Sequence, residues 1–361
     1  MKRYYIGLLS LLLASALPAQ NTVKMSAVKS NDFGVAYNLP KTTIVIKADA
    51  TKTTRKAGEF YEYAERYLNI SNPITQDETI YTINALTATT GAIPDKDKSY
   101  LVEFRSGTTV PFVTLTKDGL ICAINADAQF SPVEGAANTV TEETVKALPN
   151  PNSFLSEETL RAGSKSRQAE MVSKQIFLLR ETRNNILTGE ADNMPPDGNA
   201  YKLVMERLDS QEKALTSMFA GSETVESLSK TYTIVPTTKD INNQIVFRFS
   251  KKLGFVDSEN MAGAPVTLTL INKEPAGEPP VLSPKEQKAW DDKFAKGIIY
   301  NIPAKASMKV EFDNKAWVNK EVDVVQYGKQ EVLIPKMFEN NKQPVKVIFF
   351  PEMGAIKQII Q

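Results

Sequence analysis

A single stretch of clear helical periodicity divides a chain whose remaining patterned segments favour β-strands. Apolar side chains recur three or four positions apart between residues 172 and 186 and again between residues 201 and 218. Gly189 predicts the end of the first helix, and the Pro-Pro-Asp-Gly run at 195–198 predicts a tight connection. Two helices joined by a short turn pack antiparallel. The sequence therefore predicts an antiparallel helical hairpin over residues 168–221.

β-Branched and aromatic residues dominate on both sides of this hairpin. Residues 20–130 predict an N-terminal β-rich domain with one helix. Its first residues, 20–32, are polar and unpatterned, and we expect them to form a flexible lead. Residues 131–167 have the Pro, Ser, Asn and Glu content of a linker. Residues 222–361 predict a C-terminal β-rich domain. The expected fold class is α+β, with two β-rich domains joined by the antiparallel helical hairpin.

The N-terminus has the three parts of a signal peptide. Lys2 and Arg3 supply positive charge, residues 4–17 are apolar, and Ala19 is a small residue before a cleavage point. The apolar run is shorter than a membrane span requires. We therefore expect residues 1–19 to be removed on export, and the protein to lie in the periplasm or on the outer membrane.

The composition excludes several chemistries. The chain of 361 residues has no histidine and one cysteine, Cys122, with a net charge of +1. Serine–histidine and cysteine–histidine catalysis, histidine-ligated zinc and an intrachain disulfide are therefore impossible within it. Cys122 lies among aliphatic residues, so we expect a small buried core residue. No phosphate-binding or dinucleotide motif, basic stripe or later apolar run occurs, so we expect no cofactor, no nucleic acid and no transmembrane span.

One acidic cluster is a candidate for cation binding. Glu190, Asp192 and Asp197 fall in the connection between the two expected helices. Carboxylate oxygens suit a hard cation such as calcium, although the spacing lacks the register of a known calcium loop. Helix capping in a solvated turn is the alternative, and we favour it.

Two parts of the chain share a pattern. Residues 34–40 and 297–303 both contain Tyr-Asn, one aliphatic residue and proline, and a hairpin centred on Gly119 or Gly354 follows each. If the two parts share one plan, both glycines should have positive φ, and each Tyr-Asn strand should lie beside its own hairpin. Residues 55–82 would then be a helical insertion in the first part. Chance similarity is the alternative.

The helical region also carries a family resemblance. The chain resembles an uncharacterised family of secreted Bacteroidota proteins, domain of unknown function 4831, over residues 33–361. The motifs that carry it are Leu179-Arg180-Glu181, Leu187-Thr188-Gly189-Glu190, Pro195-Pro196-Asp197-Gly198 and Phe219-Ala220-Gly221. The resemblance implies an exported protein of a Gram-negative envelope and implies no activity.

These observations favour a non-enzymatic envelope protein with a binding or assembly role, because exposed strand edges can accept another strand. Its partner would be an envelope protein or a glycan, and the sequence leaves its oligomeric state open. The alternative is an envelope hydrolase that cleaves glycans with two carboxylates, although no motif pairs two of them. A third interpretation is a structural module stabilised by calcium at the acidic connection.

Overall fold

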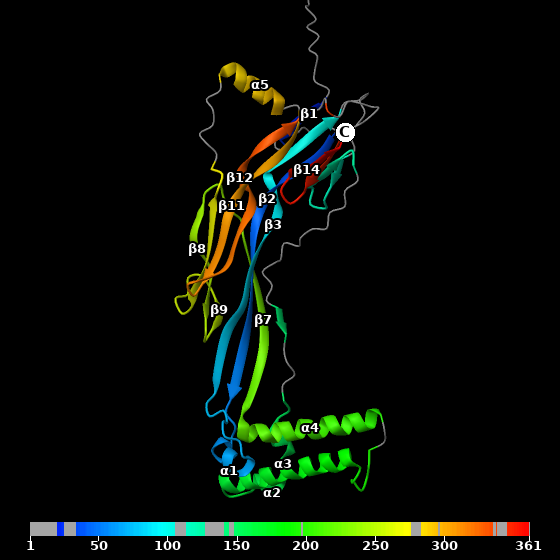
Figure 1. Cartoon of the computed structure of the whole chain (residues 1–361), viewed down its shortest axis with the longest axis vertical. Helices are drawn as coiled ribbons and strands as arrows, with labels where there is room; N and C mark the ends of the chain where they lie inside the picture. Colours follow the sequence, from blue (N-terminus) through cyan, green and yellow to red (C-terminus); the bar gives the residue numbers. More distant parts are fainter. Residues whose placement is uncertain are drawn as a thin grey trace, which may run out of the picture.

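The protein is an elongated, β-rich molecule built mainly from antiparallel strands, with a group of helices at one end (Figure 1). This β-rich, α-containing composition agrees with the expected class. The expected signal peptide at 1–19 lies outside the described residues. The computed structural model describes residues 20–24, 34–104, 113–126, 141–143, 148–195, 198–275, 283–294, 297–334, 337 and 345–360.

The first sheet is organised around one long hairpin. Strands β2 (Gly34–Lys56) and β3 (Glu78–Phe104) pair along almost their whole length, and the connection between them folds as a short helical segment. The strand order is β1-β3-β2-β7-β6. The other members are β1 (Gln20–Lys24), β7 (Ser222–Ile234) and β6 (Thr141–Glu143).

A second sheet packs against the middle of the long hairpin. Its order is β12-β11-β10-β8-β9. The strands are β8 (Ile241–Ser250), β9 (Gly254–Val256), β10 (Ala264–Asn272), β11 (Ile298–Phe312) and β12 (Lys315–Leu333). Alternate side chains of both sheets point inward, as half-buried strands require. They form a core that includes Ile44, Ile46, Leu86, Phe247, Leu268, Met308 and Val324.

A third, smaller sheet covers the far ends of the two long hairpins. Its order is β14-β13-β5-β4. Tyr37 of β2 lies in the core that this sheet covers and is almost fully buried. Its hydroxyl donates to the Ile299 carbonyl at 3.0 Å and accepts from the Ile299 N–H at 2.8 Å. The Tyr37 hydroxyl thus ties β2 to β11. The strands are β4 (Val113–Leu115), β5 (Ile121–Ile124), β13 (Lys346–Phe350) and β14 (Ala355–Ile360).

The two long helices lie side by side at the opposite end of the molecule (Figure 1). They are α3 (Lys165–Thr188) and α4 (Asn199–Ala220). Ser164 caps the start of α3, and Gly189, at φ 79°, ends it. The remaining helical segments are α1 (Ala64–Leu68), α2 (Glu157–Leu160), α5 (Pro284–Phe294) and short 3₁₀ turns at Tyr61–Tyr63 and Pro151–Phe154.

The predicted helical stripes point into the core of this helical end. Val172 and Ile176 of α3 are fully buried with Leu215 and Phe219 of α4, against Phe60 from the β2–β3 connection. Burial of these side chains, more than the modest intrinsic helix propensity of the segment, holds the two helices together.

Strands from the two expected β-rich regions share sheets. β7 pairs with β2 from Ile44 opposite Ile234 to Lys56 opposite Ser222, and β13 pairs with β5. The helices, expected as a joint between the two regions, lie beyond the ends of β2 and β7. Residues 20–24 of the expected flexible lead form an edge strand on β3. Strand partners depend on contacts distant in sequence, which local patterning does not specify.

The shared pattern has a structural counterpart. Gly119 and Gly354 both have positive φ, 77° and 62°, as predicted. The Asn38 N–H donates to the Gly119 carbonyl at 2.8 Å, and the Asn301 N–H donates to the Gly354 carbonyl at 2.9 Å. Each Tyr-Asn strand therefore lies beside its own hairpin turn. Residues 57–77 connect β2 to β3, whereas the corresponding strands β11 and β12 are joined by a turn of only two residues.

Candidate functional site

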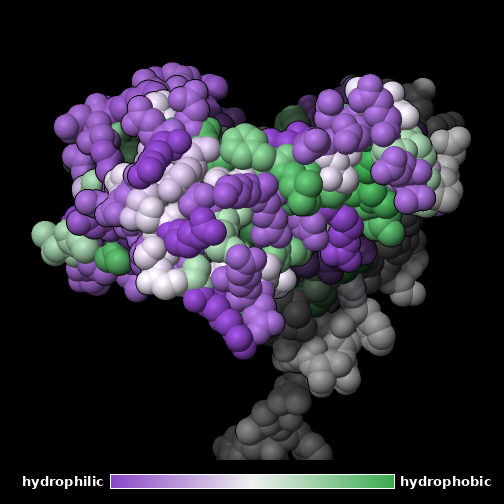
Figure 2. All heavy atoms as spheres, turned by 90° about the horizontal axis from the view of Figure 1, so that it is seen from below, coloured by the Kyte–Doolittle hydropathy of each residue, from purple (hydrophilic) through white to green (hydrophobic). Residues whose placement is uncertain are grey.

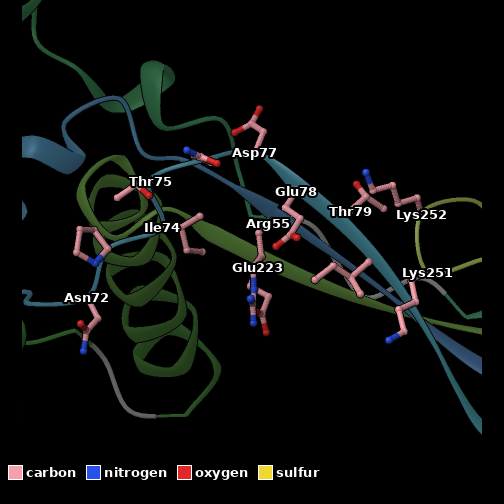
Figure 3. A pocket seen from close by; sticks show the side chains of 13 residues that line it. Arg55, Asn72, Ile74, Thr75, Asp77, Glu78, Thr79, Glu223, Lys251 and Lys252 are labelled. Atoms are coloured by element: carbon pink, nitrogen blue, oxygen red, sulfur yellow. The ribbon is translucent and has the colours of Figure 1, made fainter.

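An open groove of about 960 Å³ lies where the long strands meet the helical end (Figure 3). Its charged lining comes from the ends of β2, β3 and β7, from the β2–β3 connection and from the turn after β8. The charged residues are Arg55, Asp77, Glu78, Glu223, Lys251 and Lys252. Positive and negative groups are equal in number, so the groove has no strong preference for one sign of ligand.

Two glutamates of this groove flank one arginine. Strand register places Arg55 opposite Glu78 on one side and opposite Glu223 on the other. The Arg55 Nε donates to the Glu223 carboxylate at 2.6 Å, and this contact raises the pKa of Arg55. Asp77 accepts from the Ala57 N–H at 2.8 Å. The first contact joins β2 to β7, and the second joins the two ends of the β2–β3 connection. Arg55 occupies the position between the two glutamates.

The expected cation ligands are only partly described. Glu190 and Asp192 are exposed in the connection after α3, and Asp197 lies outside the described residues. The Glu190 N–H donates to the Asn185 carbonyl at 2.8 Å, which closes the helix end. Among the residues that the structure describes, no three acidic or cysteine side chains gather as a metal site.

Cys122 is a core residue, as predicted. It lies in β5 and is 2% exposed, and its Sγ is 3.8 Å from the Leu120 carbonyl oxygen. Burial raises the pKa of the Cys122 thiol. A buried thiol with a raised pKa is a poor nucleophile, so Cys122 is a packing residue.

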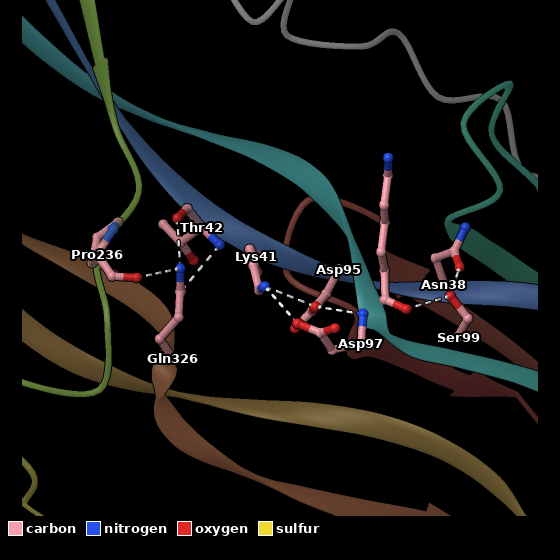
Figure 4. Close-up of polar contacts among 9 residues, drawn as sticks. Asn38, Lys41, Thr42, Asp95, Asp97, Ser99, Pro236 and Gln326 are labelled. Carbon is pink, nitrogen blue, oxygen red and sulfur yellow. Dashed lines mark hydrogen bonds and ion pairs between the residues drawn. The ribbon is translucent and has the colours of Figure 1, made fainter. Parts of the chain in front are cut away.

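A partly buried ion pair lies where β3 bulges away from β2 (Figure 4). The Lys41 Nζ is 2.9 Å from the Asp95 carboxylate, which is almost fully buried, and 3.5 Å from Asp97. Asp95 also accepts from the Asp97 N–H, and its contact with Lys41 raises the lysine pKa. The sequence showed only alternating charges here, because Lys41 and Asp95 meet through strand pairing.

One edge of β3 has no neighbouring strand within the described residues. β1 covers β3 only from Tyr100 to Phe104, so the stretch from Glu78 to Ser99 has no described strand on the side away from β2. At one point, the Tyr81 N–H donates to the Lys251 carbonyl at 2.8 Å. We call residues 83–94 of this stretch the open edge.

The hydrogen bonds of Thr42 in β2 show which residues of the open edge turn their backbone N–H and C=O groups outward, away from β2. The Thr42 N–H and C=O both bond the Gln326 side chain, on the side of β2 away from β3. Residues opposite Thr42 and its alternate neighbours therefore turn their own backbone groups away from β2. These β3 residues are Leu86, Ala88, Thr90 and Ala92.

The open edge also lacks charge. Residues 79–94 contain no Asp, Glu, Lys or Arg, and Thr87, Thr89 and Thr90 are exposed. Natural sheet edges are commonly protected by charged side chains, by proline or by a covering element. Of these devices, the open edge has only a bulge at Asn84 and the proline at its end, Pro94.

The helical end exposes several large apolar side chains. Figure 2 looks onto this end and shows hydrophobic residues between hydrophilic ones. The exposed residues are Phe177, Leu178, Leu187, Met194 and Leu203. Arg180 stacks over the Phe177 ring at 5.6 Å and bonds Glu212 of α4, so part of this surface is ordered by cation–π and ionic contacts.

The chain belongs to a family of unknown function. Residues 33–357 match the family described as Domain of unknown function (DUF4831). No curated protein and no solved structure matches the chain. No described helix is long and apolar enough to cross a membrane.

Proposed function

We propose that this protein is an exported, non-enzymatic component of the bacterial envelope that acts in binding or assembly by accepting a strand. The open edge of β3 is the observation that carries this proposal. Backbone groups along such an edge bond an added strand, and the side chains beside it select the partner. Export is supported by the leader pattern of residues 1–19 and by the resemblance to secreted proteins.

The proposal includes an architecture of two β units built on one plan. The paired contacts of Asn38 with Gly119 and of Asn301 with Gly354 support it. In this arrangement the helical hairpin and the β2–β3 connection are additions to the first unit. They leave the middle of β3, which contains the open edge, without a covering strand among the described residues.

The glycan hydrolase alternative has weaker support. Its mechanism needs two carboxyl groups that face the same glycosidic bond across a gap. Glu78 and Glu223 of the groove flank Arg55 instead, and Glu223 is its ion-pair partner. Substitution of both glutamates by glutamine tests this alternative: a glycanase would lose its hydrolysis of envelope polysaccharide, whereas a binding protein has none to lose.

The proposed function is tested in the native host with tagged protein expressed from its own promoter. We expect processed protein starting near Gln20 in envelope fractions, and a chemically cross-linked complex of defined size. Thr89→Lys, in the open edge, should abolish that complex. Thr82→Lys is the matched control, because Thr82 is exposed on the same strand outside the open edge. Full-length protein in the cytosol, or a complex unaffected by Thr89→Lys, would contradict the proposal.

A further inference from the structure

The geometry points to a second copy of this chain as the strand that occupies the open edge. We infer that β3 pairs antiparallel with β3 of another molecule, about a two-fold axis at Thr89. This inference rests on the proposed strand-accepting role and names the partner. It would join the first sheets of two molecules into one continuous sheet.

The backbone pattern suits this symmetry. The groups that face outward belong to residues 86, 88, 90 and 92. About an axis at Thr89, residue 86 lies opposite residue 92 of the second copy, and residue 88 lies opposite residue 90. All four outward-facing residues thus meet outward-facing residues, which is the hydrogen-bonded pairing of an antiparallel ladder.

The side chains also suit self-pairing. Two-fold symmetry places like side chains near one another, so a charged edge repels its own copy. Residues 79–94 have no charge, and Thr89 would face Thr89 of the second copy, with Thr87 facing Gly91. Threonine pairs across strands are favourable. A partner chosen by charge would require a charged edge, which this stretch does not provide.

β12, the long outermost strand of the second sheet, differs from the open edge in its charge. β12 carries Lys320, Glu321 and Asp323 in its middle, and Lys329 and Glu331 near its end. Charges of this kind are a common protection against edge-to-edge association. The difference between β12 and the open edge of β3 indicates which edge can accept a copy of the same chain.

The length of the open edge is bounded at both ends. On one side, the Lys251 carbonyl already accepts the Tyr81 N–H. On the other, β3 bulges at Asp95, which is held by Lys41. A single edge of this length buries less surface than a standard stable interface, so we expect a dimer that forms in a concentration-dependent way.

Sedimentation equilibrium of the purified protein tests the inference directly. We expect the average mass to rise toward twice that of the chain as concentration increases, and Thr89→Lys to remain monomeric with an unchanged melting temperature. Thr82→Lys should associate like the unmodified protein. Dimers that persist in Thr89→Lys, or a monomer at every concentration that stays in solution, would overturn the inference.

Disulfide trapping gives a second readout that does not depend on affinity. Directly opposed residues of a non-hydrogen-bonded antiparallel pair have Cα atoms about 4.5 Å apart, within the range that a disulfide spans. Thr89→Cys should therefore form a covalent dimer under mild oxidation. Thr82→Cys should not, because position 82 lies far from its symmetry copy. Cys122 is buried and does not compete. Equal trapping of both variants would contradict the register.

The outcomes separate this inference from the proposed function. If the protein stays monomeric while Thr89→Lys still abolishes the envelope complex, the open edge binds a different protein and only the inference fails. If Thr89→Lys affects neither self-association nor the envelope complex, both fail.

Discussion

The side chain of Gln326 makes with Thr42 the two hydrogen bonds that a neighbouring strand would make (Figure 4). The Thr42 N–H donates to Gln326 Oε1 at 3.1 Å, and Gln326 Nε2 donates to the Thr42 carbonyl at 2.8 Å and to the Pro236 carbonyl at 3.1 Å. β7 ends its pairing at Ile234, so the glutamine continues the ladder beyond it. The backbone N–H and C=O of Thr42, on the side of β2 away from β3, therefore have hydrogen-bond partners, in contrast with the outward-facing backbone groups of the open edge.

Replacement of this glutamine should destabilise the fold. In Gln326→Leu, the buried N–H and C=O of Thr42 would lose their partners, at a cost of about 1–3 kcal/mol in the free energy of unfolding. Gln358→Leu, at an exposed position of β14, is the matched control. Urea denaturation measures both variants. Equal stability of the two would show that Thr42 finds other partners.

Gly354 should tolerate alanine less well than a glycine in open space. A Cβ at Gly354 would lie 2.7 Å from Pro40 Cδ and 3.0 Å from Asn301 Nδ2, at a φ of 62°. Gly354→Ala should therefore lower the free energy of unfolding by about 1–2 kcal/mol or more. Gly163 has no atom within 4 Å of its Cβ position, so Gly163→Ala should be close to neutral. A harmless Gly354→Ala would contradict this reading of the turn.

A leucine series tests the packing of α4. Leu215 is fully buried, Leu208 is partly buried, and Leu203 is 58% exposed. Leu215→Ala should cost about 2–5 kcal/mol of unfolding free energy. Leu208→Ala should lower the melting temperature by a smaller amount, and Leu203→Ala should have little effect. Calorimetry of the three variants ranks their losses of stability. Any other ranking would place the buried stripe on a different face of α4.

Stability should fall at alkaline pH because of buried tyrosines. Burial raises the pKa of Tyr37 well above its usual value of 10.0, and raises that of Tyr327 to about 12. Each folded-state pKa lies above the unfolded value, so their contribution is complete below pH 10 and is lost as the pH rises further. We expect the free energy of unfolding to decline above about pH 10, and the decline to be shallower in Tyr37→Phe. An equal slope in both proteins would exclude Tyr37 as a source.

The local features of this protein follow from its sequence alone. The stripe containing Val172 and Ile176 faces the core, and the glycine that ends α3 adopts the left-handed conformation. The turns at Gly119 and Gly354 also follow from neighbouring residues alone. Helical periodicity, capping and turn conformation are properties of a few adjacent residues, so a single sequence contains the information for them.

Which strands are neighbours depends on contacts between distant parts of the chain. Thr42 and Gln326 are 284 positions apart, and the pairing of β7 with β2 crosses the boundary expected from composition. The uncharged run at 79–94 is visible in the sequence, but nothing in it indicates an edge. A strand's period is fixed by its own residues, whereas its partner depends on which distant segments can bury a complementary face and share its hydrogen bonds.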